Sequence, residues 1–232
     1  MRNYFSTLFL SALLCCACGH VEEKVSQTYA DGGRQQVLQV KRNGDKEIRT
    51  GEQKYYPNGT LQYEKHFSGN HESPTGQWIY NYMDGSTFAT ATFDKNHPLG
   101  RDWKFYDHNG QPLFKEAYDS MKVTELSDQQ TPETVVLTKG ADETQYQFYS
   151  DGSLRSKGQY HNSLRQGHWV YYHANGLTQA EADYVDGKEN GIYCVYRENG
   201  IPYYRGLYSD GKRTGKWEFY DAAGQMTSSK VF

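Results

Sequence analysis

Gly167-His168-Trp169-Val170-Tyr171-Tyr172 is the stretch that decides the fold, because it recurs along the chain at a fixed interval. It returns 24 residues later as Gly191-Ile192-Tyr193-Cys194-Val195-Tyr196, and again as Gly215-Lys216-Trp217-Glu218-Phe219-Tyr220. Each copy is followed four residues later by a glycine. Drifted copies occur around residues 55–59, 76–85 and 100–110. A constant period of this length is typical of a repeat protein.

The glycine after each copy usually follows Asn or Asp. These turn dipeptides are Asn58-Gly59, Asp84-Gly85, Asn109-Gly110, Asp151-Gly152, Asn175-Gly176 and Asn199-Gly200. Asn-Gly and Asp-Gly tolerate the positive φ that tight hairpin turns require. Short aromatic runs of strand length lie on both sides of each turn. The sequence therefore predicts one antiparallel β-hairpin per period, with a first strand before the turn and a second strand after it.

The second strand has a period of two. Its eighth residue after the turn glycine is aromatic in successive copies: Phe67, Phe93, Tyr118, Tyr160, Tyr184 and Tyr208. Even-numbered places share one face of a strand, so we expect these rings to stack into a ladder between repeats. In the first strand, Trp169 and Tyr171 share a face, which we interpret as core.

A second turn closes each unit and carries the most specific motif. The string Tyr-x-Asp-Gly-Lys-x-x-Gly spans Tyr184–Gly191 and Tyr208–Gly215. It is similar to the MORN repeat, and the whole unit resembles the bacterial MORN-repeat variant over residues 51–118 and 144–227. The resemblance implies an all-β fold: an elongated array of antiparallel hairpins forming one twisted sheet. Asn162-Ser163 departs from the pattern, since it replaces Asp-Gly.

The repeats divide the chain into five segments. We expect a lipoprotein signal peptide at 1–17, a flexible tether at 18–36, N-terminal repeats at 37–118 and C-terminal repeats at 144–232. Val37-Leu38-Gln39-Val40 is predicted to begin the sheet as a capping strand. Residues 119–143 interrupt the period, and they are either a degenerate repeat or a loop insertion. We favour a degenerate unit that carries an inserted loop.

The first residues have the parts of a secretory leader. Arg2 precedes a short apolar run, and Cys15, Cys16 and Cys18 follow it. This cluster resembles the lipobox of bacterial lipoproteins, which implies cleavage before a lipid-modified cysteine. Cys18 is the predicted attachment site, because Ala17 gives it a small preceding residue. There are two alternatives: the lipid is attached at Cys15 or Cys16, or the chain is an ordinary secreted protein without a lipid.

Composition and motifs narrow the function. A net charge of -3 gives no electrostatic reason to expect a nucleic-acid partner. The apolar fraction is only 36%, beside 21 Tyr and 23 Gly, which suits a thin β-structure better than a deep-cored enzyme. No histidine has zinc-ligand spacing, and no nucleophile elbow, P-loop or Rossmann motif is present. We predict no catalytic residues, no metal and no cofactor.

One aromatic feature indicates a surface role. A tyrosine recurs at the end of the first strand, and the candidate binding stripe is Tyr106, Tyr149, Tyr172, Tyr196 and Tyr220. Such rings supply contact area at low entropic cost. The alternative, that they shield the second face of the sheet, explains the pattern equally well.

These observations predict a non-enzymatic, lipid-anchored scaffold of the bacterial cell envelope that binds another envelope protein. A carbohydrate- or cell-wall-binding module is the alternative, disfavoured because Ala180, Ala182 and Tyr184 stand where such repeats carry a second Trp. The resemblance also implies a toxin–antitoxin antitoxin label, which some proteins with this repeat variant carry. A cytoplasmic toxin partner conflicts with an export leader, so the label is a classification rather than a mechanism.

Overall fold

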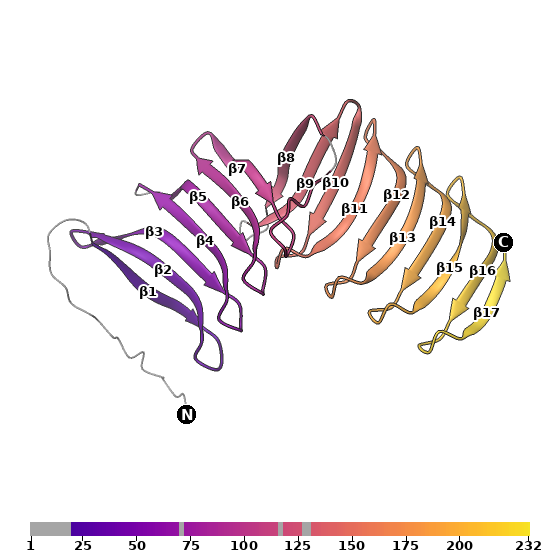
Figure 1. Cartoon of the computed structure of the whole chain (residues 1–232), viewed down its shortest axis with the longest axis horizontal. Helices are drawn as coiled ribbons and strands as arrows, with labels where there is room; N and C mark the ends of the chain where they lie inside the picture. The colour runs from indigo at the N-terminus through magenta and orange to yellow at the C-terminus, as the bar shows by residue number, and fades with distance from the viewer. Residues whose placement is uncertain (1–19, 70–71, 116–117, 127–130) are drawn as a thin grey trace.

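The computed structural model describes residues 20–69, 72–115, 118–126 and 131–232, and these form strands and turns without a helix (Figure 1). The first sheet contains β1 (Val21–Thr28), β2 (Arg34–Asn43), β3 (Lys46–Tyr55), β4 (Leu61–Ser68), β5 (Ser73–Asn81), β6 (Thr87–Asp94) and β7 (His97–Phe105). The second contains β8 (Ser120–Leu126), β9 (Pro132–Lys139), β10 (Asp142–Phe148), β11 (Leu154–His161), β12 (Leu164–Tyr172), β13 (Thr178–Val185), β14 (Lys188–Tyr196), β15 (Pro202–Ser209), β16 (Lys212–Tyr220) and β17 (Met226–Val231). The predicted array of antiparallel hairpins is confirmed.

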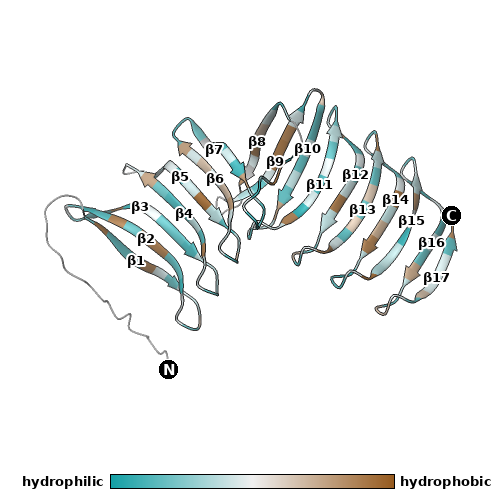
Figure 2. Ribbon diagram, in the orientation of Figure 1, coloured by the Kyte–Doolittle hydropathy of each residue, from teal (hydrophilic) through white to brown (hydrophobic). Residues whose placement is uncertain are grey.

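The array is divided into a seven-stranded and a ten-stranded sheet, whereas the sequence predicted a single one. In both sheets each strand pairs with its neighbours in chain order. The division follows β7, where the chain makes one bridge between Tyr106 and Pro112 and then leaves the ladder. It starts again in β8, and Figure 2 shows a long hydrophobic stretch in the next strand, β9. Packing between the sheets buries these apolar residues.

One core joins the two sheets. Phe148 of β10 packs against Phe88 and Phe105 of the first sheet, with ring centroids 5.1 and 5.8 Å apart. Gly152 lies against the Phe88 ring at a φ of +85°, and a Cβ atom there would fall 2.8 Å from that ring. The turn also accepts hydrogen bonds from the first sheet, with Tyr56 Oη 3.2 Å from the Asp151 carbonyl oxygen. Side chains from both sheets therefore fix the junction.

The ring ladder exists, but its members alternate. Tyr160 and Tyr184 both contact Trp169 edge-on, at 5.1 and 6.2 Å between ring centroids, and Tyr208 contacts Trp217 in the same way at 5.2 Å. Trp169 thus separates Tyr160 from Tyr184, which we expected to stack directly, and Tyr193 of β14 contacts Tyr208 at 5.2 Å. Tyr118 is an exception to the ladder, since its side chain is exposed.

The flexible tether predicted at 18–36 is wrong for the residues that the structure describes, because they belong to the sheet from Val21 onward. β1 pairs with β2 over most of its length, and the Tyr29 hydroxyl donates a hydrogen bond to the Tyr55 carbonyl oxygen at 2.7 Å. This polar strand is held in the sheet by backbone pairing. Its sequence therefore needs no apolar period, and without one the strand was not predicted. β2 extends from Arg34 through the expected capping strand.

The interrupting segment 119–143 holds β8, β9 and the start of β10, which form one end of the second sheet. Val123 of β8 and Val135 of β9 are buried opposite each other in the core between the sheets. The segment is therefore built mainly of strands. The predicted leader (residues 1–17) and Cys18 lie outside the described residues.

Candidate functional site

The second sheet presents two chemically different faces between β12 and β17. We call the face that carries Trp169, Tyr193 and Trp217 the ladder face. Both tryptophans are almost fully buried, although the ladder face consists of a single layer of rings on the sheet. Arg165 covers the Trp169 ring and Arg213 covers the Trp217 ring, at 4.6 and 4.4 Å from the ring centroids. The rings are thus closed off by their own neighbours.

The opposite side, which we call the charged face, is organised as a row across the strands. In register, Glu181 of β13 lies opposite Cys194 of β14, Cys194 opposite Arg205 of β15, and Arg205 opposite Glu218 of β16. Alternation along each strand places these residues on the side away from the tryptophans. Burial raises the pKa of the Cys194 thiol, which disfavours a reactive cysteine.

Glu218 collects the polar contacts at one end of this row. It accepts hydrogen bonds from the Tyr220 hydroxyl at 2.8 Å, from Lys216 Nζ at 3.0 Å and from Arg205 Nε at 2.8 Å. These contacts, the Tyr220 hydroxyl first, lower the pKa of Glu218 to about 2. The carboxylate therefore stays charged at every physiological pH.

Exposed apolar side chains lie beside the row. Ile192 of β14 is 50% exposed and pairs with Leu207 of β15, which is 47% exposed. Val185 at the end of β13 is 42% exposed. The charged face thus combines exposed aliphatic side chains with fixed charges on a rigid sheet, a mixture typical of protein-binding surfaces.

The structure brings together only part of the predicted tyrosine stripe. Tyr172, Tyr196 and Tyr220 occupy the same place at the ends of β12, β14 and β16, and all three are half-buried. Tyr106 holds the equivalent place beyond β7 in the first sheet. Tyr149 is one residue further on, inside the turn after β10, so its assignment to the stripe was wrong.

Tyr149 belongs instead to a row of side chains that tie each repeat to the next. These residues stand three places before a turn glycine, and each reaches the carbonyl oxygen at the end of the next first strand. The contacts are Tyr29 to Tyr55, Tyr56 to Asn81, Tyr82 to Tyr106, Tyr149 to Tyr172, His173 to Tyr196 and Arg197 to Tyr220, at 2.7–3.1 Å. This row was not predicted from the sequence, although its members all stand at the same distance from a turn glycine.

The last hairpin turn in each sheet carries Asp at this place. Asp107 accepts hydrogen bonds from the backbone N–H groups of Asn109 and Gln111, both at 2.9 Å. Asp221 accepts them from Ala223 and Gln225, also at 2.9 Å. At these two turns the Asp side chain therefore bonds within its own turn.

The first sheet contains a buried charged cluster where the second sheet has aromatic rings. Glu52 occupies the first-strand place that corresponds to Trp169, and it accepts hydrogen bonds from Tyr63 at 2.5 Å and Arg49 at 2.9 Å. Lys65 is 3% exposed, and its ammonium group lies 3.7 Å from the Tyr63 ring centroid. Burial lowers the pKa of Lys65 to about 7, against the opposing effect of Glu52.

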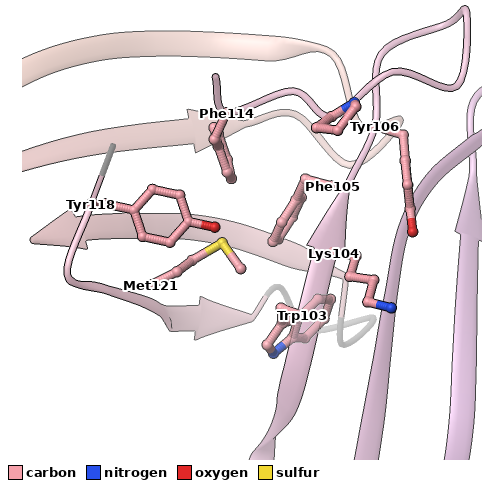
Figure 3. Close-up of a pocket in the computed structure, with 8 residues that line it drawn as sticks. Trp103, Lys104, Phe105, Tyr106, Phe114, Tyr118 and Met121 are labelled. Atoms are coloured by element: carbon pink, nitrogen blue, oxygen red, sulfur yellow. The ribbon is translucent and has the colours of Figure 1, made fainter. Parts of the chain in front are cut away.

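A pocket of about 280 Å³ opens where the two sheets meet. Figure 3 shows Trp103 and Phe105 of β7 beside Phe114, Tyr118 and Met121, which come from the connection to the second sheet and from β8. Tyr106 of the predicted stripe also lines this pocket. Its apolar lining could hold a side chain or a small ring.

A family model described as the MORN repeat variant matches residues 49–68 and 144–162. This is a MORN-repeat-variant protein. The matched segments hold most of the β3–β4 and β10–β11 hairpins, one in each sheet. The repeats of this MORN-repeat-variant protein suggest a binding or scaffold role. No curated protein matches the chain.

Among solved structures, the chain is similar to a point mutant of S. aureus TarM in complex with fondaparinux, alpha-GlcNAc-glycerol and UDP. The identity is 9% and the TM-score 0.29, over 48% of this chain and 19% of TarM. The likeness to TarM is too low to bear on function.

Within the described ranges, no three His, Cys, Asp or Glu side chains come together as a metal site would require. Several histidines instead pair singly with carboxylates, as His161 does with Asp142 and His168 with Asp183, both at 2.7 Å. In the same part of the chain, no helix is long and apolar enough to cross a bilayer.

Proposed function

We propose that this MORN-repeat-variant protein is a non-enzymatic, lipid-anchored scaffold of the bacterial envelope, and that the charged face of its second sheet binds another envelope protein. The observation that carries the proposal is the exposure of Ile192 and Leu207, each about half, beside the charged row of Glu181, Arg205 and Glu218. Aliphatic side chains supply contact area, while fixed charges select the partner.

A glycan is the alternative partner, and the surfaces of the second sheet suit it less well than a protein. Sugar rings stack on exposed aromatic faces, but Trp169 and Trp217 are 3% and 0% exposed. Arginine side chains already lie over both rings. The half-buried tyrosines Tyr172, Tyr196 and Tyr220 offer a narrower platform, so a glycan would have to bind there.

Site-specific photo-crosslinking in intact cells tests the protein partner. A photoreactive amino acid at Ile192 or Leu207 is expected to give one discrete crosslinked band, and Arg205→Glu in the same chain should remove it. Met83, 50% exposed at a turn of the first sheet, is the matched control position and should give no such band. Equal bands from all three positions, or none from Ile192 and Leu207, would overturn the proposal.

A second experiment separates the glycan alternative. The purified chain and its Tyr172→Ala, Tyr196→Ala double variant are mixed with isolated cell-wall sacculi and sedimented. Co-sedimentation that the tyrosine double variant loses and Arg205→Glu keeps would assign the site to a glycan. The proposal expects no dependence on these tyrosines in this assay.

The lipid anchor rests on the sequence around Ala17 and Cys18. Metabolic labelling with a radioactive fatty acid should tag the wild-type protein and leave Cys18→Ala unlabelled. Continued labelling of this variant would move the attachment site to Cys15 or Cys16. Absence of label from the wild type would contradict the anchor.

A further inference from the structure

The ladder face repeats one arrangement at three successive first strands, β12, β14 and β16. Each strand carries a large ring at the same distance from its turn glycine: Trp169, Tyr193 and Trp217. At the two outer steps an arginine of the same strand lies over the ring, Arg165 at 4.6 Å and Arg213 at 4.4 Å from the ring centroid. A cation over the ring is therefore a regular part of this face.

The middle step carries an acid where its neighbours carry arginine. Glu189 pairs across strands with Tyr184, as Arg213 pairs with Tyr208. The shared register places the Glu189 side chain in the row of the two arginines, on the ladder face. Among the described residues, no lysine or arginine forms an ion pair with Glu189 or lies over the Tyr193 ring. The middle step thus combines a ring with a negative charge.

Two further rings lie beside Tyr193. Tyr208 meets it edge-on, with ring centroids 5.2 Å apart, and Tyr204 lies nearly parallel to it, with centroids 6.3 Å apart and 9° between the ring planes. All three rings are half-buried, so each is partly accessible. The Glu189 carboxylate adds a full negative charge to the partial negative charge of the ring faces. Aromatic rings together with an acid are a combination that binds cations.

We propose that the middle step binds the guanidinium group of an arginine from a partner protein, which lies over the Tyr193 ring beside Glu189. Arg165 and Arg213 show the geometry, because each places its guanidinium over the ring of its own step. A planar guanidinium can stack on a ring and also bond a carboxylate, which suits this step better than a lysine ammonium. Charge complementarity with Glu189 therefore selects the occupant. The ladder face lies opposite the charged face, so this proposal does not depend on the proposed function.

The test uses a pair of small probes. N-acetyl-arginine amide carries the guanidinium, and N-acetyl-citrulline amide is the control, because citrulline has nearly the same shape without the charge. Saturation-transfer NMR with the detergent-solubilised full chain should show saturable binding of the arginine probe and severalfold weaker binding of the citrulline probe. Binding of the arginine probe should also weaken at high salt, because salt screens its attraction to Glu189.

Variants locate the probe. Glu189→Arg should fill the step from within, since its guanidinium takes the place that Arg165 and Arg213 have at the outer steps. We expect this variant to lose probe binding and to unfold at a higher urea concentration than the wild type. Glu198→Arg makes the same change of charge at an exposed turn position, and it should keep wild-type binding. Glu189→Gln removes the charge with little change of shape, and it should weaken binding severalfold.

Equal binding of the two probes, unchanged binding in Glu189→Arg, or no binding would overturn the proposal. Stronger binding of choline than of the arginine probe would also overturn it, since a free quaternary ammonium ligand would then be the better occupant. Self-association of the chain that Glu189→Arg abolishes would show that a second copy supplies the arginine, and would exclude the partner protein. None of these outcomes affects the crosslinking expected at Ile192 and Leu207, which tests the charged face.

Discussion

The indole of Trp217 lies directly on the backbone of Gly206. A Cβ atom at Gly206 would fall 2.3 Å from Cδ2 of the indole, and the same relationship joins Gly158 to Trp169, at 2.0 Å. These glycines do not have positive φ, so the contact with the indole is what requires them. Each lies on the second strand of the preceding repeat, so the close contact joins one repeat to the next.

Gly206→Ala is therefore expected to destabilise the chain by about 1–3 kcal/mol, the usual range for overpacking a filled site. Urea unfolding followed by circular dichroism measures the free energy of unfolding. In a chain that already carries Trp217→Leu, adding Gly206→Ala should cost less stability than it does in the wild type, because the two positions couple directly. An unchanged unfolding midpoint in Gly206→Ala would contradict the close contact.

The two tyrosine positions of the hairpin should differ in their effect on stability. Tyr184 is 6% exposed and packs on Trp169, so Tyr184→Ala should cost roughly 3–5 kcal/mol. Tyr172 is half-buried, and Tyr172→Ala should cost about 1 kcal/mol. Urea melts of both variants make the comparison. Equal losses would show that both positions belong to the core.

The tie between repeats can be tested without removing a ring. Tyr149→Phe deletes only the hydroxyl that donates to the Tyr172 carbonyl oxygen at 2.8 Å. We expect a loss of about 0.5–1.5 kcal/mol in the free energy of unfolding, the usual value of one hydrogen bond. Tyr203→Phe, at a ring that is 48% exposed, is the control and should be nearly neutral. Equal effects of the two changes would argue against a stabilising tie.

Lys65 should make stability depend on pH above neutrality. Its folded-state pKa is lowered to about 7, below the value near 10.4 in an unfolded chain. Between these values the unfolded state binds more protons, so stability rises with pH, by at most about 1.4 kcal/mol per pH unit. The destabilisation is fully present below pH 7 and decreases as pH rises from 7 to 9.

Lys65→Met removes this titration and keeps the aliphatic contact with Trp78 and Tyr63, so its stability between pH 7 and 9 should be flatter than that of the wild type. Arg49 still neutralises Glu52 in this variant, at 2.9 Å. Urea melts at several pH values in this window check the slope. Parallel curves for variant and wild type would show that Lys65 is not the titrating group.

Local patterns were sufficient to predict the hairpins and most of their faces. Asn175-Gly176 and the other turn dipeptides specify positive φ within a few residues, and Gly176 has a φ of +82°. Trp169 and Tyr184 were predicted as core from a period of two, and both are buried. The polar strand β1 was not predicted, because it is held by backbone pairing, which requires no apolar period in the sequence. Tyr149 was misplaced, because the one-residue offset between the end of a strand and its turn cannot be seen in an aromatic pattern.

The sequence by itself determined the repeat, its turns and its all-β class, because each depends on residues within one period. Only the tertiary structure decided where the sheet divides and which rings interleave. Phe148 meets Phe88 and Phe105, and Tyr56 reaches the turn at Asp151, across separations of about 40 to 95 residues. Such contacts depend on how two finished sheets pack together, and no local pattern specifies that packing.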